Sequence, residues 1–324
     1  EIEVGDWSSD VCSSDLRRRL TLLSAERRKS MSFSTETKNE LSRIEERNEN
    51  CRLAELAGFF RAAGSVGLAG NGRFKIVIAT DNPAAARHYK KLVKECFAVD
   101  MQLKISRAGA LKKGHTYVLT IDSQMKNEDI LRETGILFTC EGKKSISDGI
   151  PDGIIKEKYR KRAYLRGFFM GAGTISDPDR SYHLEFVCNT ENLARDLKKL
   201  IDTFDDLAAK ITRRKDRFAV YMKNSRYISD MLAIMGAHAQ VLEFENIKIK
   251  KGIVNETVRI TNCDNANTDR TLDASQKQIA AIRKIIDRGA LAALPDKLRE
   301  LAELRLENQR LRSEERRVGK ECRS

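Results

Sequence analysis

A nine-residue pattern of small, aliphatic and aromatic residues occurs twice in this chain, as LAGFFRAAG at 56–64 and as LRGFFMGAG at 165–173. Glycine and alanine recur within each copy, and such small residues allow two helix backbones to approach closely. Each copy runs directly into a segment with strand character, at Ser65 and at Thr174. The repeated pattern therefore predicts two matched half-domains whose motif helices pack against each other.

The segments that follow the two motifs repeat as well. After the first motif the pattern predicts alternating hairpins and helices: a hairpin over 65–78 with its turn at Asn71-Gly72, a helix from Pro83, a hairpin over 100–121 and a helix near 127–135. Three groups of residues recur in the second half: Ala86-Arg87 as Ala194-Arg195, Lys90-Lys91-Leu92 as Lys198-Lys199-Leu200, and Asp129-Ile130-Leu131 as Asp230-Met231-Leu232. The predicted fold class is α+β, a pseudo-two-fold duplication of an α-β-β-α-β-β-α unit.

An all-helical C-terminal domain is predicted to follow this duplication. Beyond Gly236 the chain is charged and compatible with helix. We expect one helix over 241–262, a second, amphipathic helix from Asp273 to Gly289, and a third that begins near Pro295.

The charge of the chain points to a polyanionic partner. With 60 Lys and Arg against 47 Asp and Glu, the formal net charge is +13, which favours nucleic acid. The alternative is that these charges only solvate the surface. Seven cysteines without a C-x-x-C pair, and four scattered histidines, exclude a zinc framework or a disulfide scaffold and fit a reducing cytoplasm. No apolar run approaches the roughly 18 residues of a membrane span.

The repeated pattern resembles the LAGLIDADG motif of homing endonucleases, whose paired helices bring their last carboxylates to a metal-bound phosphate. The position of that acid is occupied by Ala63 in the first copy and by Ala172 in the second. Without carboxylate oxygens a hard cation such as Mg²⁺ has no ligands there. Asp177 and Asp179 lie past the second motif and have no counterpart after the first. The resemblance therefore implies a nuclease scaffold without catalytic residues, bound metal or cofactor; an active homing endonuclease or maturase is the alternative.

In a saddle of this kind the sheets of both halves straddle a DNA duplex. Basic residues cluster at one hairpin turn in each half: Lys112 and Lys113 in the first, and Arg213, Arg214, Lys215 and Arg217 in the second. We expect these six residues to contact phosphates, which would make the affinity for DNA fall with salt. Solvated turn tips are the alternative, because turns are usually polar.

Three further segments, MSFSTETKNEL from Met31, RITNCDNAN from Arg259 and ALPDKLRELA from Ala293, resemble the WhiA family of Gram-positive bacteria together with the degenerate motif pair. The resemblance covers residues 31–308. It implies a cytoplasmic, nucleoid-associated transcription factor of sporulation, cell division and chromosome segregation, with a C-terminal helix-turn-helix that binds double-stranded DNA. Other transcription factors or RNA polymerase are further expected partners, whereas a membrane or a small-molecule substrate is not. A protein-binding scaffold in cell division is a second alternative.

Both ends of the chain differ from the remainder. Residues 8–16 and 313–324 resemble translated adapter sequence, and the charges of the first 30 residues balance. The helix pair with the recognition helix is then expected to be missing, which predicts weak, salt-sensitive DNA binding. The predicted segments are an N-terminal segment (1–30), a first half (31–140), a linker (141–157), a second half (158–240), a helical linker with a truncated helix-turn-helix domain (241–312) and a tail (313–324).

Overall fold

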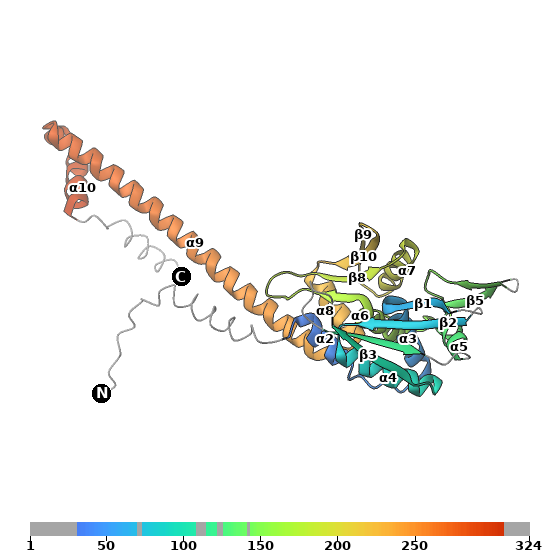
Figure 1. The fold of residues 1–324 in the computed structure, drawn as a ribbon. Coiled ribbons are helices and arrows are strands. Elements are labelled where there is room, and N and C mark those ends of the chain that lie inside the picture. The colour runs from blue at the N-terminus through green and yellow to red at the C-terminus, as the bar shows by residue number, and fades with distance from the viewer. Residues whose placement is uncertain (1–30, 70–72, 108–114, 122–125, 141–142, 308–324) are drawn as a thin grey trace, which may run out of the picture. The chain divides into compact units, whose positions relative to one another are not determined.

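The computed structural model describes residues 31–69, 73–107, 115–121, 126–140 and 143–307 (Figure 1). Contacts divide the chain into two units, with the boundary between Lys248 and Ile249. Within the described residues, no helix is both long enough and apolar enough to cross a membrane.

The first half of the first unit contains four helices and four strands among the described residues. A short helix precedes the motif helix, and two hairpins alternate with two further helices. The elements are α2 (Phe33–Leu41), α3 (Glu49–Ala63), β1 (Gly64–Ala69), β2 (Arg73–Thr80), α4 (Pro83–Phe97), β3 (Met101–Arg107), β4 (His115–Ile121) and α5 (Lys126–Glu133).

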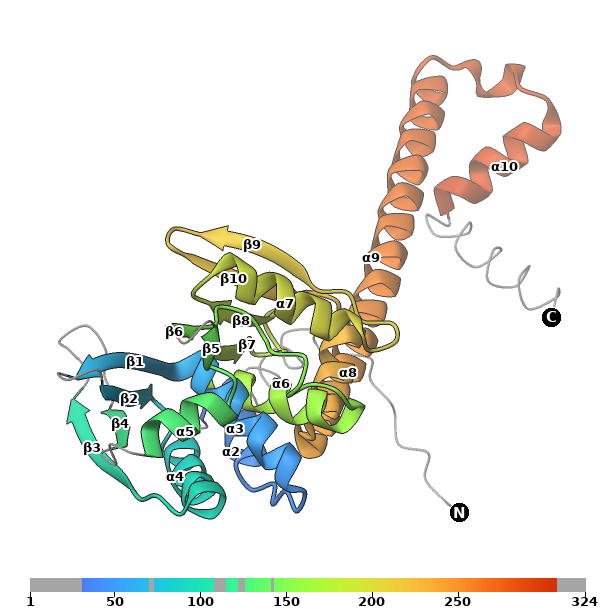
Figure 2. The same ribbon diagram turned by 90° about the vertical axis from the view of Figure 1, so that its right-hand side faces the viewer.

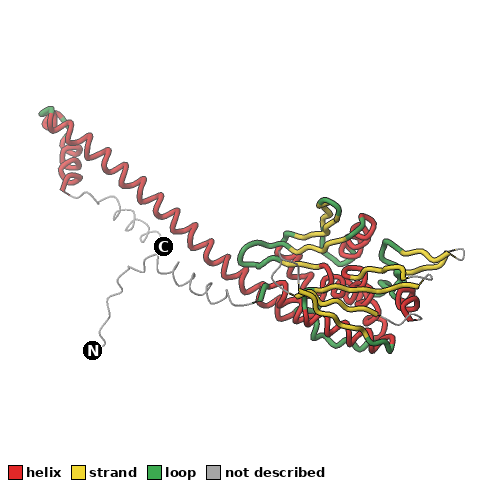
Figure 3. Tube along the Cα trace, viewed as in Figure 1, coloured by secondary structure: helices red, strands yellow, loops and turns green. Residues whose placement is uncertain are grey.

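The second half repeats the order that follows α2. Its elements are α6 (Lys158–Ala172), β7 (Gly173–Ile175), β8 (Leu184–Cys188), α7 (Glu191–Asp202), β9 (Lys210–Arg214), β10 (Arg217–Met222) and α8 (Ser225–Met235). The strand orders match: β1-β2-β4-β3 in one sheet and β7-β8-β10-β9 in the other, with antiparallel neighbours throughout. Figure 3 shows the strands in yellow and the helices in red. The predicted duplication is confirmed.

Helices cover one face of each sheet. Helix α4 packs on β2, β3 and β4, and α7 packs on β8, β9 and β10. Figure 2 shows α3 and α6 side by side between the two sheets, in agreement with their extensive mutual contacts. The face of each sheet that is turned away from these helices is called its outer face.

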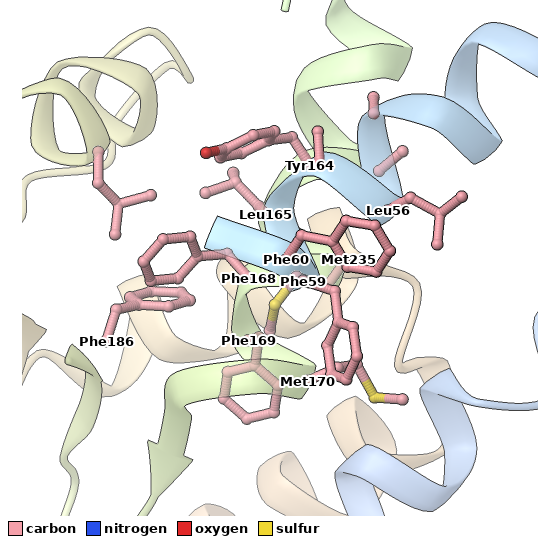
Figure 4. Packing of buried hydrophobic residues seen from close by; sticks show 14 of the residues in the cluster. Leu56, Phe59, Phe60, Tyr164, Leu165, Phe168, Phe169, Met170, Phe186 and Met235 are labelled. Atoms are coloured by element: carbon pink, nitrogen blue, oxygen red, sulfur yellow. The ribbon is translucent and has the colours of Figure 1, made fainter. Parts of the chain in front are cut away.

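The two motif helices meet at backbone distance, as the sequence predicts. A Cβ atom added to Gly58 would lie 2.2 Å from the carbonyl oxygen of Tyr164, and one added to Gly167 would lie 2.0 Å from that of Glu55. No side chain larger than hydrogen fits at either position without movement of a helix. The motif phenylalanines point away from the crossing into the core, where all four are buried (Figure 4): Phe59, Phe60, Phe168 and Phe169.

Local sequence sets where the helices of the first half begin. The side chain of Asn48 accepts hydrogen bonds from the amides of Asn50 and Cys51 and caps α3. Asn82 caps α4 in the same way, and Pro83 occupies the first turn, where no amide donor is needed. The sequence prediction for the start of α4 is confirmed.

A two-stranded hairpin that the sequence analysis did not predict follows α5. Strands β5 (Leu137–Cys140) and β6 (Lys143–Ile146) pair with each other. Arg61 of the first motif holds this region, because its guanidinium donates hydrogen bonds to the carbonyls of Ser147 and Gly135. These short strands do not alternate between apolar and polar residues, so their sequences do not predict a strand.

The C-terminal helices differ from the prediction. The expected helices over 241–262 and from Asp273 are one helix, α9 (His238–Asp287), which is followed by the 3₁₀ helix η2 (Ala290–Ala293) and by α10 (Asp296–Glu307). No proline or glycine occurs between Ile253 and Asp287, so nothing interrupts the helical hydrogen bonds. Hydroxyl groups within this stretch donate to the carbonyl four residues earlier instead of starting a new helix, as at Thr261 and Thr268.

Candidate nucleic-acid interface

The two positions of the motif acid lie at the ends of the motif helices. Ala63 is the last residue of α3 and Ala172 the last of α6, and both are half-buried. The helix ends adjoin, because a Cβ atom on Gly171 would lie 3.2 Å from the Cβ of Ala63. Asp177 accepts a hydrogen bond from the amide of Asp179 in a loop beyond β7. Among the described residues, no group of three His, Cys, Asp or Glu side chains could hold a metal ion.

The outer face of the first sheet is polar and carries lysines. Alternation along β2 buries Ile76 and Ile78 toward the helices and leaves Lys75 exposed. Strand pairing places Lys104 of β3 on the same outer face, opposite Val118. The described side chains of this face contain no acid: Ser65, Lys75, Val77, Ala79, Gln102, Lys104, Ser106, Thr116, Val118 and Thr120.

The outer face of the second sheet has more cations and also one acid. Lys210 pairs with Tyr221, and Arg214 pairs with Arg217, so all four side chains share this face. Glu185 of β8 lies opposite Tyr221 on the same face. The second sheet therefore presents a mixed charge pattern where the first presents only positive charge.

Glu185 holds a polar cluster on this face that sequence reasoning missed. Its carboxylate lies 2.9 Å from Nη1 of Arg214 and 3.1 Å from Nε2 of His183, and it accepts a hydrogen bond from Thr174 at 3.4 Å. The ring of His183 lies 5.7 Å from that of Tyr221. The alternation of the segment LEFVC, with Glu185 between buried Leu184 and Phe186, is the only signal in the sequence.

The predicted basic residues of the second half do not form one group. Strand alternation separates Arg213 from Arg214, and the guanidinium of Arg213 lies 6.0 Å above the ring of Phe218 on the helix-covered side. Lys215 occupies the turn with a left-handed φ of 51°, and Arg217 begins β10 on the outer face. Arg213 therefore lies on the face opposite to Arg214, because neighbouring residues of a strand point to opposite faces.

Two groups of predicted features lie outside the described residues. Lys112 and Lys113 fall within 108–114, outside the described residues. The expected Asn71-Gly72 turn also lies outside them, as does the whole segment 308–324, which includes the predicted tail and the place where a recognition helix was expected to be missing.

A buried ion pair ties the two motif helices together. Glu55 of α3 is 1% exposed, and its Oε2 accepts hydrogen bonds from Nε and Nη2 of Arg166 of α6 at 3.0 and 2.7 Å. Its Oε1 lies 2.8 Å from Nε2 of His88 and 3.5 Å from the hydroxyl of Tyr89. Burial acts to raise the pKa of Glu55, but the hydrogen bond from His88 and the charge of Arg166 outweigh burial and leave this pKa lowered.

The tyrosine beside this pair packs tightly. The ring of Tyr89 stacks on that of Phe59 at 3.5 Å with an interplanar angle of 6°. Burial, and then the negative charge of Glu55, raise the pKa of Tyr89 well above its ordinary value. The hydroxyl therefore stays protonated and able to donate to Glu55. Sequence inspection gave no sign of this cluster, because its members come from three separate helices.

Comparison with known proteins gives matches to both halves and to the C-terminal part. A model of the WhiA N-terminal LAGLIDADG-like domain matches residues 49–137, and one of the WhiA LAGLIDADG-like domain matches residues 161–253. A model of the WhiA C-terminal HTH domain matches residues 257–315.

Similar proteins and structures carry the same name. A probable cell division protein WhiA from Heliobacterium modesticaldum is 42% identical over 277 residues, which cover 86% of each chain. Another from Alkaliphilus metalliredigens is 41% identical and covers 86% of this chain and 88% of its own. The crystal structure of full-length DUF199/WhiA from Thermatoga maritima aligns with a TM-score of 0.59 at 24% identity, over 86% of this chain and 88% of that one. That similarity shows a shared fold.

Proposed function

Because this chain belongs to the WhiA family, we propose that it is a DNA-binding transcriptional regulator whose LAGLIDADG-like frame does not cut DNA. The match of residues 257–315 to a helix-turn-helix domain is the observation that carries the regulatory role. Relatives are named probable cell division proteins, and we extend this role to the present chain. Sporulation, chromosome segregation and a place on the bacterial nucleoid belong to the same proposal.

The lack of nuclease activity is proposed from the ends of the motif helices. Phosphodiester hydrolysis with hard cations needs carboxylate oxygens where the helices meet. Ala63 and Ala172 supply only methyl groups there, and Gly171 lies beside them. The nearby Asp177 and Asp179 lie on a loop of the second half alone. This junction favours close packing of two helices over the binding of a cation.

We assign contacts with the DNA backbone to the outer faces of the two sheets. Lys75 and Lys104 face outward on the first sheet without an acid among its described outer side chains. On the second sheet Lys210 and Arg217 face outward, while Arg214 is already paired with Glu185. The first sheet should therefore bind phosphates more strongly for each cation that it presents. Lys112, Lys113 and Lys215 of the hairpin turns extend the proposed set.

A salt titration tests this assignment. Binding of a fluorescent DNA duplex is followed by anisotropy at increasing KCl for the parent chain and for a Lys75→Ala/Lys104→Ala variant. Each lost phosphate contact should reduce the slope of log affinity against log salt by about 1. Lys94→Ala is the matched control, because Lys94 is exposed on α4 away from both outer faces. Equal slopes for all three proteins would contradict the assignment of backbone contacts to the first sheet.

A further inference from the structure

A cavity on the first half lies away from the outer sheet faces. It has a volume of about 730 Å³ and is lined by the segment between α2 and α3, by the start of α3 and by one side of α4. This volume is within the roughly 300–1,000 Å³ of cavities that hold small molecules. All of its lining residues belong to the described part of the chain, and its lining is rich in arginine.

The acids of the cavity are already satisfied. Glu45 pairs with Lys91 at 3.1 Å, and Glu95 lies 3.7 Å from Arg52. The remaining two, Glu46 and Glu55, both contact Arg166 of the other half. Each carboxylate that lines the cavity therefore already has a basic partner within the protein.

Three arginines that line the cavity lack an ion-pair partner among the described residues. The guanidinium groups of Arg43, Arg47 and Arg87 have no hydrogen-bond or ion-pair partner among the described residues, and all three side chains line the cavity. All three side chains are exposed, and unpaired guanidinium groups along one cavity attract phosphate or carboxylate, which they bind through paired N–H donors. The lining carries five Lys and Arg side chains against four Glu, which leaves a small net positive charge.

A buried donor gives an independent sign of a missing acceptor. Nε of Arg52, which also lines the cavity, is buried and has no hydrogen-bond acceptor in the described structure. A buried donor without an acceptor is costly in a folded protein, and one beside a cavity is commonly satisfied by a ligand or by water. One lining residue, His88, is fixed in position, because its Nε2 lies 2.8 Å from Oε1 of the buried Glu55.

We propose that this cavity binds a small phosphorylated molecule carrying at least two phosphate groups, held by Arg43, Arg47 and Arg87. Such a ligand supplies oxygen acceptors for the unpaired guanidinium groups and for Nε of Arg52. Polymeric DNA is a poorer candidate, because the cavity is a single half-open depression lined by α4, the start of α3 and the segment between α2 and α3, with no residue from either sheet. The site does not depend on the proposed role of the outer sheet faces.

The corresponding place in the second half provides a matched control. Arg195 of α7 occupies the position that Arg87 holds in α4, as the repeated Ala-Arg pair shows, but Arg195 is paired with Glu191. A ligand held by unpaired arginines should therefore depend on Arg87 and not on Arg195. Loss of charge is the same in the two substitutions.

Calorimetric titration of the full chain with pyrophosphate, ATP and GTP tests the proposal. We expect saturable binding of at least one of these probes, weakened tenfold or more by Arg87→Ala and by Arg43→Ala/Arg47→Ala, and unchanged by Arg195→Ala. Lys104→Ala on the outer sheet face should also leave it unchanged. Circular dichroism and the unfolding midpoint of each variant identify any that does not fold, and Arg87→Lys then replaces a variant lost in this way. No saturable binding of any probe up to millimolar concentration would overturn the proposal. Equal weakening by Arg195→Ala or Lys104→Ala would overturn it too.

Discussion

The two halves share one fold, but the helix after the first hairpin has different surroundings in each half. In the first half, the exposed side of α4 borders the 730 Å³ cavity with its unpaired arginines. In the second half, the linker lies against α7: the amide of Ile150 donates to Oδ2 of Asp196 at 3.1 Å, and a Cβ atom on Gly149 would lie 2.4 Å from that oxygen. The pocket that remains there is smaller, about 460 Å³. Duplication preserved the scaffold while the surface charges diverged.

The motif helices show the same divergence inside the core. Glu55 of α3 corresponds to Tyr164 of α6, the residue that precedes the motif in each copy. Glu55 is a buried carboxylate satisfied by Arg166 and His88. The hydroxyl of Tyr164 is buried without a hydrogen-bond acceptor in the described structure, and burial raises its pKa. The first half thus depends on charge at this position, and the second half depends on packing.

Removing one partner of the buried ion pair should have the largest effect. Arg166→Met leaves the carboxylate of Glu55 buried beside an apolar chain and should lower the free energy of unfolding by about 3–5 kcal/mol. Tyr164→Phe removes only an unsatisfied hydroxyl and should cost about 1 kcal/mol or less. Urea unfolding followed by circular dichroism measures both. Similar losses of unfolding free energy for the two variants would contradict the view that the first half depends on charge at this position and the second on packing.

Methyl groups at the helix crossing should come next. Gly58→Ala and Gly167→Ala each push a methyl group into the opposing backbone and should each cost about 3 kcal/mol. Equal losses of unfolding free energy for the two variants would show that α3 and α6 contribute equally to their crossing, although the surfaces of the two halves differ. Gly252→Ala in α9 is the control, because nothing lies within 4 Å of its added Cβ, and it should be neutral or slightly stabilising. A neutral Gly58→Ala would argue against close contact of the two helices.

Acid should weaken the first half through Glu55. Because the pKa of Glu55 is lowered in the folded state, its ionised form contributes stability above the ordinary glutamate pKa of about 4.3. That contribution is lost as the pH falls through the folded-state pKa. The free energy of unfolding of the parent chain should therefore fall more steeply below about pH 4.3 than that of Glu55→Gln. Parallel pH profiles would show that Glu55 gains no net stability from its partners.

The linker contact should give the smallest effect. Asp196→Ala removes the acceptor of the Ile150 amide and should cost about 1 kcal/mol. The same variant should make the peptide bonds near Gly149 more accessible, so limited proteolysis should cut there sooner. His88→Ala at the corresponding position of α4 should leave the linker as resistant as in the parent chain. If Asp196→Ala does not change the cleavage rate, the linker is held by other contacts.

Local sequence patterns predicted much of this fold. The remaining features depend on contacts between residues far apart in the sequence. The glycines of the two motifs predicted the helix crossing, because small residues at that spacing allow the two motif helices to approach at backbone distance. The separation of Arg213 from Arg214 also follows from strand alternation, once the hairpin is placed.

Other features leave no local signal. The pair between Glu55 and Arg166 joins residues far apart in sequence, and the cavity requires three helical segments to meet. The continuity of α9 was missed because polar residues around Asp273 are equally compatible with a cap and with a helix interior.

Incubation of the parent chain with supercoiled plasmid and Mg²⁺, under conditions where anisotropy shows the DNA to be bound, tests most directly whether the motif junction has lost its chemistry. We predict that the plasmid stays supercoiled with protein in excess over DNA. Nicked or linear plasmid that forms only with Mg²⁺, disappears with a chelator and follows the protein through a second purification would contradict it.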